Sequence, residues 1–263
     1  MIYLLVIFAV QRKMRSRPPY KLRHSLALWN SALSFFSVFG SYFMLTEMLD
    51  VIINKSFHHS VCYSSIDERA QYWMWLFAMS KIIELGDTIF IVLRKQRLTF
   101  LHYCHHVSAL IYTWYSVSQN ISLGRWFVTM NFCVHTLMYG YYSLRSLQYR
   151  VPKPIAMLIT TLQIVQMIFG GYVCFYALQA KVEGTYCEIP MRTVTLGVLV
   201  YIAMLIMFAQ FFVRAYLSGG RRKSIANTLR SLSSNGAANV NGNCNGIANG
   251  VSTSIDRSHQ KLQ

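Results

Sequence analysis

Three histidines, His102, His105 and His106, lie within five residues of the sequence. At about 100° per residue, a helix would place their side chains within roughly 100° of one face. Imidazoles grouped in this way can bind a metal ion or act as nucleophile and base. A lone histidine in a helix is most often a hydrogen-bonded packing residue, but three together seldom are. We therefore take this segment as a candidate catalytic site.

A second polar group precedes the histidines. Lys81, Glu84, Asp87 and Thr88 would share one helical face about 120° wide. Ionisable side chains inside a long apolar window are costly to bury and are functional by default. A structural ion pair between helices is the alternative interpretation, but one lysine with two acids exceeds what a simple pair needs.

A third segment carries a polar stripe. His135, Met138, Tyr139 and Tyr142 follow i, i+3, i+4, i+7 spacing, and Asn131 stands one turn before them. Tyrosines alone would equally suit anchors at a membrane interface. The histidine and the asparagine favour a polar pocket.

A fourth segment places Thr160, Gln163 and Gln166 three residues apart. Hydrogen bonding between membrane helices explains this pattern as well as substrate binding does.

All four segments belong to long apolar stretches. Of the 263 residues, 54% are hydrophobic and only 13% are charged, whereas a soluble domain typically has about 25% charged residues. About 20 apolar residues cross a hydrocarbon core of ~30 Å. The windows of this length are 25–47, 71–93, 99–118, 124–143, 155–178 and 193–216. A seventh run, Ile2–Val10, is too short to span alone and indicates a first membrane helix that is clipped or continued upstream.

A net charge of +16 is compatible with binding to nucleic acid, but basic and acidic residues are concentrated in alternate loops. Residues 11–24 carry six Lys or Arg, 94–97 three, 144–153 three and 214–230 five, while the intervening connections hold or border most of the acids. This alternation is what positive-inside sorting predicts, and nucleic-acid binding would not need it. We expect the basic loops and the C-terminal tail on the cytosolic side, and all four polar segments in the cytosolic half of the bundle.

The same topology sorts the cysteines. Cys62 and Cys187 both fall in predicted non-cytosolic loops, where an oxidising compartment allows a disulfide, and we predict that bond. Residues 1–217 form one membrane domain in this interpretation. The composition changes afterwards to Ser, Asn, Gly and Ala, which predicts a disordered cytosolic tail over 218–263.

Taken together, the four motifs resemble the ELO family of very-long-chain fatty acid elongases. The pattern KxxExxDT is met by 81–88, HxxHH by 102–106, HxxMYxYY by 135–142 and TxxQxxQ by 160–166, in the family's order and intervals. Arg97 stands where polyunsaturated-type members usually carry glutamine, so the chain is most similar to the branch that handles saturated and monounsaturated acyl chains.

The resemblance implies an all-α protein of the endoplasmic reticulum membrane, with six complete helices and one partial transmembrane helix enclosing an acyl tunnel. It would condense a long-chain acyl-CoA with malonyl-CoA to give 3-oxoacyl-CoA, carbon dioxide and CoA. The implied partners are these two CoA esters and membrane lipid. A second copy of the chain, forming a homodimer, and the reductases and dehydratase of the elongation cycle are further partners that the resemblance allows. No metal, cofactor or nucleic acid is expected.

The resemblance also assigns roles to the polar residues. His105 is the expected nucleophile, His135 would place or activate the malonyl unit, and His102 and His106 would tune their neighbours. Glu84 and Asp87 would orient imidazoles. The remaining expected substrate-binding residues are Lys81, Thr88, Asn131, Met138, Tyr139, Tyr142, Gln163 and Gln166.

Two rival classes stay open at this point. Di-iron membrane desaturases and hydroxylases also use histidine boxes, but they need about eight metal-directed histidines, and only His102, His105, His106 and His135 fall inside the bundle. In a seven-helix receptor or transporter, the clustered histidines would have no evident function.

Overall fold

A computed structural model describes residues 2–218, and within that range every regular element is helical. Residues up to Gln210 form one compact unit, and Phe211 begins a second. The helices are α1 (Ile2–Met14), α2 (Arg23–Asn54), α3 (Phe57–Cys62), α4 (Glu68–Glu84), α5 (Gly86–Leu93), α6 (Phe100–Ser118), α7 (Leu123–Ser146), α8 (Lys153–Val182) and α9 (Met191–Phe212), followed by a π-helix (Val213–Leu217). The tail that was predicted to be disordered lies, from residue 219 on, outside the described residues.

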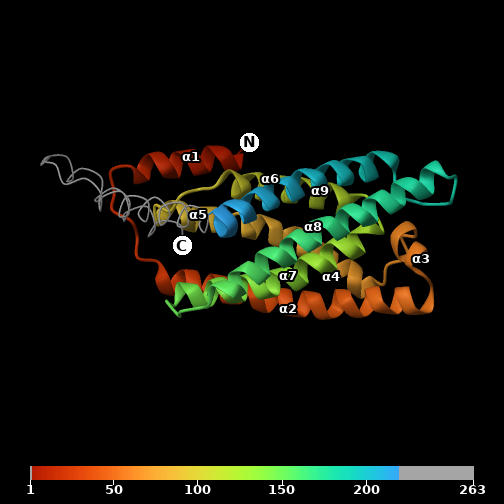
Figure 1. Ribbon diagram of the computed structural model, residues 1–263, viewed down its shortest axis with the longest axis horizontal. Helices are drawn as coiled ribbons and strands as arrows, with labels where there is room; N and C mark the ends of the chain where they lie inside the picture. Colours follow the sequence, from red (N-terminus) through yellow and green to blue (C-terminus); the bar gives the residue numbers. More distant parts are fainter. Residues whose placement is uncertain (1, 219–263) are drawn as a thin grey trace, which may run out of the picture. The chain divides into compact units, whose positions relative to one another are not determined.

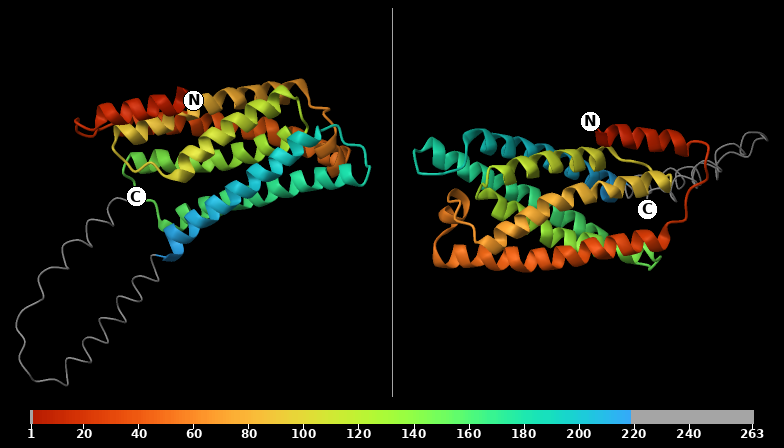
Figure 2. Two further views of the ribbon diagram at one scale, coloured as in Figure 1. Left: turned by 90° about the horizontal axis from the view of Figure 1, so that it is seen from above. Right: turned by 180° about the vertical axis from the view of Figure 1, so that it is seen from behind.

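The long helices of the first unit lie roughly along a common direction, with α3 at one end and α1 and α5 at the other (Figures 1 and 2). All six apolar windows fall on helical segments, two of them divided between consecutive helices. Within residues 2–218, three helices are long and apolar enough to cross a membrane: α2, α8 and the run Met191–Leu217. The finding supports a multi-pass membrane protein.

Small polar side chains join α2 to α7. Ser31 and Ser143 share a hydrogen bond of 2.7 Å between their hydroxyl oxygens, and the Ser34 hydroxyl donates to the Thr136 carbonyl at 2.9 Å. Small residues let helix backbones approach closely, and their hydroxyls replace the missing apolar driving force between helices in a membrane. These contacts hold α2 against α7, and α4 packs beside the pair.

Four helices end on a residue with left-handed backbone geometry: Lys95 after α5, Asn120 after α6, Gln148 after α7 and Gly184 after α8. After α7, the amide of Tyr149 donates to the carbonyl of Leu144 and the amide of Gln148 donates to that of Arg145. This is the Schellman pattern, which satisfies carbonyls that would otherwise be unpaired at a helix end. The connections between the helices are correspondingly short.

The window 71–93, predicted as one helix, is broken between α4 and α5 at Leu85. The break lies where the indole of Trp29 packs against Gly86. A β-carbon at residue 86 would lie only 2.7 Å from Cζ2 of Trp29, so glycine is needed for this approach. As a result, Lys81 and Glu84 lie on one helix, and Asp87 and Thr88 lie on the next.

The end of the bundle near α3, the disulfide end, is closed by covalent and ionic links. A disulfide joins Cys62 to Cys187, the pair predicted from the sequence, and so ties α3 to the connection between α8 and α9. Arg125 at the start of α7 is fully buried beside it. Its Nε donates to Glu47 of α2 at 2.8 Å, and its terminal nitrogens donate to the carbonyls of Ser60 and Ser65, each at 2.8 Å.

We expect Arg125→Met to destabilise the fold by about 3–5 kcal/mol, because it leaves the Glu47 carboxylate and two carbonyls without a buried partner. Unfolding of the purified protein in detergent measures the effect. Arg69→Met, which removes an exposed arginine at the same end, is the matched control. Equal stability of the two variants would contradict a structural role for the buried pair.

Candidate active site

A buried ion pair lies at the centre of the polar cluster. Lys81 Nζ is 2.7 Å from Glu84 Oε1, and both side chains are almost fully buried. Lys81 also donates to the Asn131 amide oxygen of α7 at 3.0 Å, and the Ser80 hydroxyl donates to Glu84 at 3.1 Å. A buried charge is tolerated when it is paired and hydrogen-bonded. The predicted lysine, acid and asparagine therefore form one network between α4 and α7.

His135 joins this network from α7. Its Nδ1 lies 3.7 Å from Glu84 Oε1, and its ring is edge-on to Tyr139 with centroids 5.2 Å apart. Glu84 thus lies near an imidazole, and its role in orienting that ring stays a prediction. The separation is longer than a hydrogen bond, so the contact is electrostatic.

Asp87 faces a different set of partners. Its Oδ1 accepts a hydrogen bond of 2.6 Å from the indole N–H of Trp29, and its Oδ2 accepts one of 2.8 Å from the Tyr139 hydroxyl. The sequence analysis expected Asp87 to orient an imidazole. Its two oxygens instead tie α5 to α2 and α7.

Thr88, on the same short helix, reaches the histidine segment. Its hydroxyl oxygen lies 2.9 Å from His102 Nε2 and 2.6 Å from the hydroxyl of Tyr3 on α1. The ring of His102 lies 4.3 Å from that of His106, and His106 lies 5.6 Å from His105. The three predicted imidazoles therefore form a row on α6 whose first member is held by Thr88.

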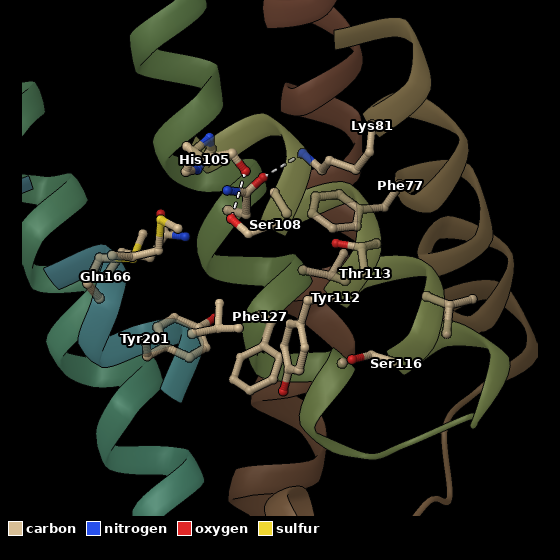
Figure 3. Close-up of a pocket in the computed structure, with 18 residues that line it drawn as sticks. Phe77, Lys81, His105, Ser108, Tyr112, Thr113, Ser116, Phe127, Gln166 and Tyr201 are labelled. Atoms are coloured by element: carbon tan, nitrogen blue, oxygen red, sulfur yellow. Dashed lines mark hydrogen bonds between the residues drawn. The ribbon is translucent and has the colours of Figure 1, made fainter. Parts of the chain in front are cut away.

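His105 is the member of this row that faces open space. It lines a cavity between α4, α6, α7, α8 and α9, together with Lys81, Asn131 and Gln166 (Figure 3). Within the described range 2–218 its ring makes no hydrogen bond; its neighbours are the rings of His106 and Phe208. Neither ring nitrogen is therefore engaged by another group in that range.

The two parts of the cavity have different lining residues. Lys81, His105 and Ser108 lie at one part, and Tyr112, Phe127 and Tyr201 lie at another (Figure 3). The space that no protein atom fills is about 700 Å³, part of it open to the surroundings. Most of the remaining lining is apolar, including Phe77, Val117, Val128, Met167, Val200 and Met204.

The other predicted residues lie around this site and do not line it. Gln163 Nε2 lies 3.2 Å from the Met138 sulfur, so these two residues pair with each other across α8 and α7. Tyr142 is largely exposed, with its ring against Tyr141. His102, His106, His135 and Tyr139 are also absent from the lining. The four motifs thus lie near one another, but their spacing alone does not distinguish the lining residues from their neighbours.

Two site residues gave no signal in the sequence. Trp29 and Tyr3 lie 58 and 85 residues from their partners Asp87 and Thr88, in apolar segments where aromatic residues are common. Only the packing of α1 and α2 shows their contacts. By contrast, Lys81 and Glu84 could be paired from their spacing alone.

This arrangement places an imidazole and a buried cation on the lining of one largely apolar cavity. A thioester or ester with a long apolar tail matches those features. Across residues 2–218 no three His, Cys, Asp or Glu side chains are grouped as metal ligands.

Comparison with known proteins agrees with this chemistry. The sequence model of the ELO, or GNS1/SUR4, family matches residues 1–224. A Drosophila melanogaster protein named "Very long chain fatty acid elongase 6" is 44% identical over 228 residues, covering 85% of this chain and 72% of its own length. "Putative fatty acid elongase 3" of Caenorhabditis elegans is 42% identical, covering 84% and 70%. The human "Very long chain fatty acid elongase 6" is 37% identical, covering 86% and 85%.

Trp29→Phe tests the interaction with Asp87. The variant keeps an aromatic ring but leaves one carboxylate oxygen unpaired, so we expect a loss of about 1.5–3 kcal/mol in the free energy of unfolding. Trp75→Phe, at an exposed tryptophan of α4, is the control and should be close to neutral. If both variants have the same free energy of unfolding as the parent protein, the hydrogen bond does not contribute to stability.

Proposed function

The chain belongs to the ELO (GNS1/SUR4) family, and from that premise we propose that it condenses a long-chain acyl-CoA with malonyl-CoA. The products are 3-oxoacyl-CoA, carbon dioxide and free CoA. The chain is thus a 3-oxoacyl-CoA synthase, which lengthens its substrate by two carbons in each cycle.

The observation that carries this proposal is the position of His105. Its ring nitrogens make no hydrogen bond within the described part of the chain, and His105 lines the same cavity as the buried ammonium of Lys81. A neutral imidazole is a competent nucleophile. The cation and the Asn131 amide lie where they can polarise a carbonyl oxygen on a substrate held in the cavity.

The first half-reaction transfers the acyl group to His105. A ring nitrogen attacks the thioester carbonyl, the carbon–sulfur bond breaks, and the ring proton leaves with the sulfur as CoA thiol. The acyl group is then attached to the imidazole, with its tail along the apolar side chains beyond Ser108.

The second half-reaction forms the new carbon–carbon bond. Malonyl-CoA loses carbon dioxide, and the electron pair of the broken bond becomes an enolate that attacks the acyl-imidazole carbonyl. The imidazole departs and takes up a proton. His135, held against Glu84 at 3.7 Å, would place or activate the malonyl unit, and Gln166 at the cavity wall would contact its polar part.

We place the acyl chain in this cavity as in a tunnel between seven membrane helices, α1 included. The CoA groups would lie at the end of the bundle away from the disulfide, where basic residues follow α1, α5 and α7. Phosphate groups are bound by such basic side chains. This orientation puts that end and the C-terminal tail in the cytosol and the disulfide end in the lumen of the endoplasmic reticulum.

The proposed chemistry uses the two CoA esters as co-substrates and no bound cofactor. The di-iron alternative needs histidines grouped as ligands, whereas His102 bonds Thr88 and His135 lies against Glu84, which leaves fewer imidazoles free than such a centre would use. Nothing in the site or the relatives favours a receptor or a transporter. Contacts with the reductases and dehydratase of the cycle, and a homodimer, stay predictions.

Membranes containing the protein should transfer label from malonyl-CoA into acyl chains two carbons longer than the acyl-CoA supplied. A panel of acyl-CoA lengths, with separation of the products by chromatography, measures this. Membranes prepared identically without the protein supply the background. Absence of incorporation with every acyl-CoA would contradict the proposal.

His105→Ala should lower condensation by more than about a thousandfold, because the nucleophile is removed. His58→Ala is the matched control: it removes another half-buried imidazole, at the disulfide end and outside the cavity lining. Activity is expressed per amount of folded protein. Near-normal turnover by His105→Ala would reassign the nucleophile.

A further inference from the structure

The first helix reaches the histidine row through one side chain. The Tyr3 hydroxyl on α1 lies 2.6 Å from the hydroxyl of Thr88, which lies 2.9 Å from His102 Nε2. Thr88 is completely buried. The three groups form a continuous chain of hydrogen bonds from α1 through α5 to α6.

The position of Tyr3 is fixed by packing. Ile7 and Met14 of α1 bury themselves against Val92 of α5, and the ring of Tyr3 packs at the edge of this small cluster. Tyr3 also lines an apolar groove with Ile83 and other residues of α4, α5 and α6. The hydroxyl is therefore the polar tip of a side chain that is otherwise in apolar contact.

The donor hydrogens of the two hydroxyl groups favour one direction for this chain of hydrogen bonds. A threonine hydroxyl has one hydrogen to donate, and so does a tyrosine hydroxyl. If Tyr3 donates to Thr88 and Thr88 donates to His102 Nε2, both hydrogens are used. In the reverse direction Tyr3 would accept, and its own hydrogen would have no partner among residues 2–218. An unpaired donor among the apolar side chains of this groove is costly, so the first arrangement is the more stable.

We infer that Tyr3 is a positioning residue for the histidine row, and this inference rests on the condensing function proposed above. By donating to Thr88, Tyr3 turns the Thr88 hydrogen toward His102. Nε2 of His102 is then an acceptor, and its neutral ring carries the proton on Nδ1. The orientation of His102 constrains that of His106 through ring contact, with centroids 4.3 Å apart, and His106 in turn packs edge-on against His105 at 5.6 Å.

Tyr3→Phe removes only the hydroxyl and keeps the ring in its apolar contacts. Thr88 is then free to accept from His102, so the tautomer is no longer fixed. We expect kcat for condensation to fall roughly 2- to 10-fold, the effect of one neutral hydrogen bond, with KM for both CoA esters unchanged. Tyr20→Phe, at an exposed tyrosine after α1, should leave both constants as they are.

A double-mutant cycle with Thr88→Val distinguishes positioning from packing. Thr88→Val breaks the chain at its centre, so adding Tyr3→Phe to it should cause no further loss. Thr88→Ser keeps the hydroxyl and should retain most of the activity. Losses that add independently would show that Tyr3 acts through packing and would overturn the inference.

The remaining outcomes are equally decisive. An active parent protein with an unaffected Tyr3→Phe variant, or one changed only in KM, refutes the role of Tyr3 while leaving the condensing function intact. A Tyr3→Phe variant that does not fold also refutes it, since the hydroxyl would then serve the fold. A parent protein without condensing activity refutes the proposed function instead.

Discussion

A lysine and a glutamate side by side in an apolar bundle must satisfy each other. Lys81 and Glu84 do so at 2.7 Å, and the remaining hydrogen-bonding capacity is met by Ser80 and by Asn131. Losing one partner of such a pair would leave a buried charge uncompensated, at a cost of about 3–5 kcal/mol. Because Asn131 belongs to α7, the pair is complete only when α4 and α7 are packed. The same packing brings His135 against Glu84, so folding and assembly of the site are one event.

The break in the helix beside this pair distributes the remaining polar groups. Leu85, at the break, keeps helical backbone angles. Beyond it, Asp87 reaches Trp29 of α2 and Tyr139 of α7, while Thr88 reaches α6. Each acid of the motif thus serves a different contact: Glu84 balances charge near the cavity, and Asp87 holds three helices together.

Local patterns predicted much of this from the sequence. Apolar length located the helices, and charge sorting by loop paired Cys62 with Cys187. Spacing grouped His102, His105 and His106 on one helix. What could not be predicted depends on pairs distant in the chain. Neither Trp29 nor Tyr3 differs in type from other aromatic residues of its segment, and the break at Leu85 follows from the indole that Gly86 admits.

The disulfide closes a stretch of 125 residues that contains all four polar motifs. Its two sulfurs can meet only if α3 and the connection between α8 and α9 emerge from the same side of the bilayer. An even number of crossings must therefore lie between them. Formation of this bond accordingly excludes every arrangement in which an odd number of the intervening segments crosses the bilayer.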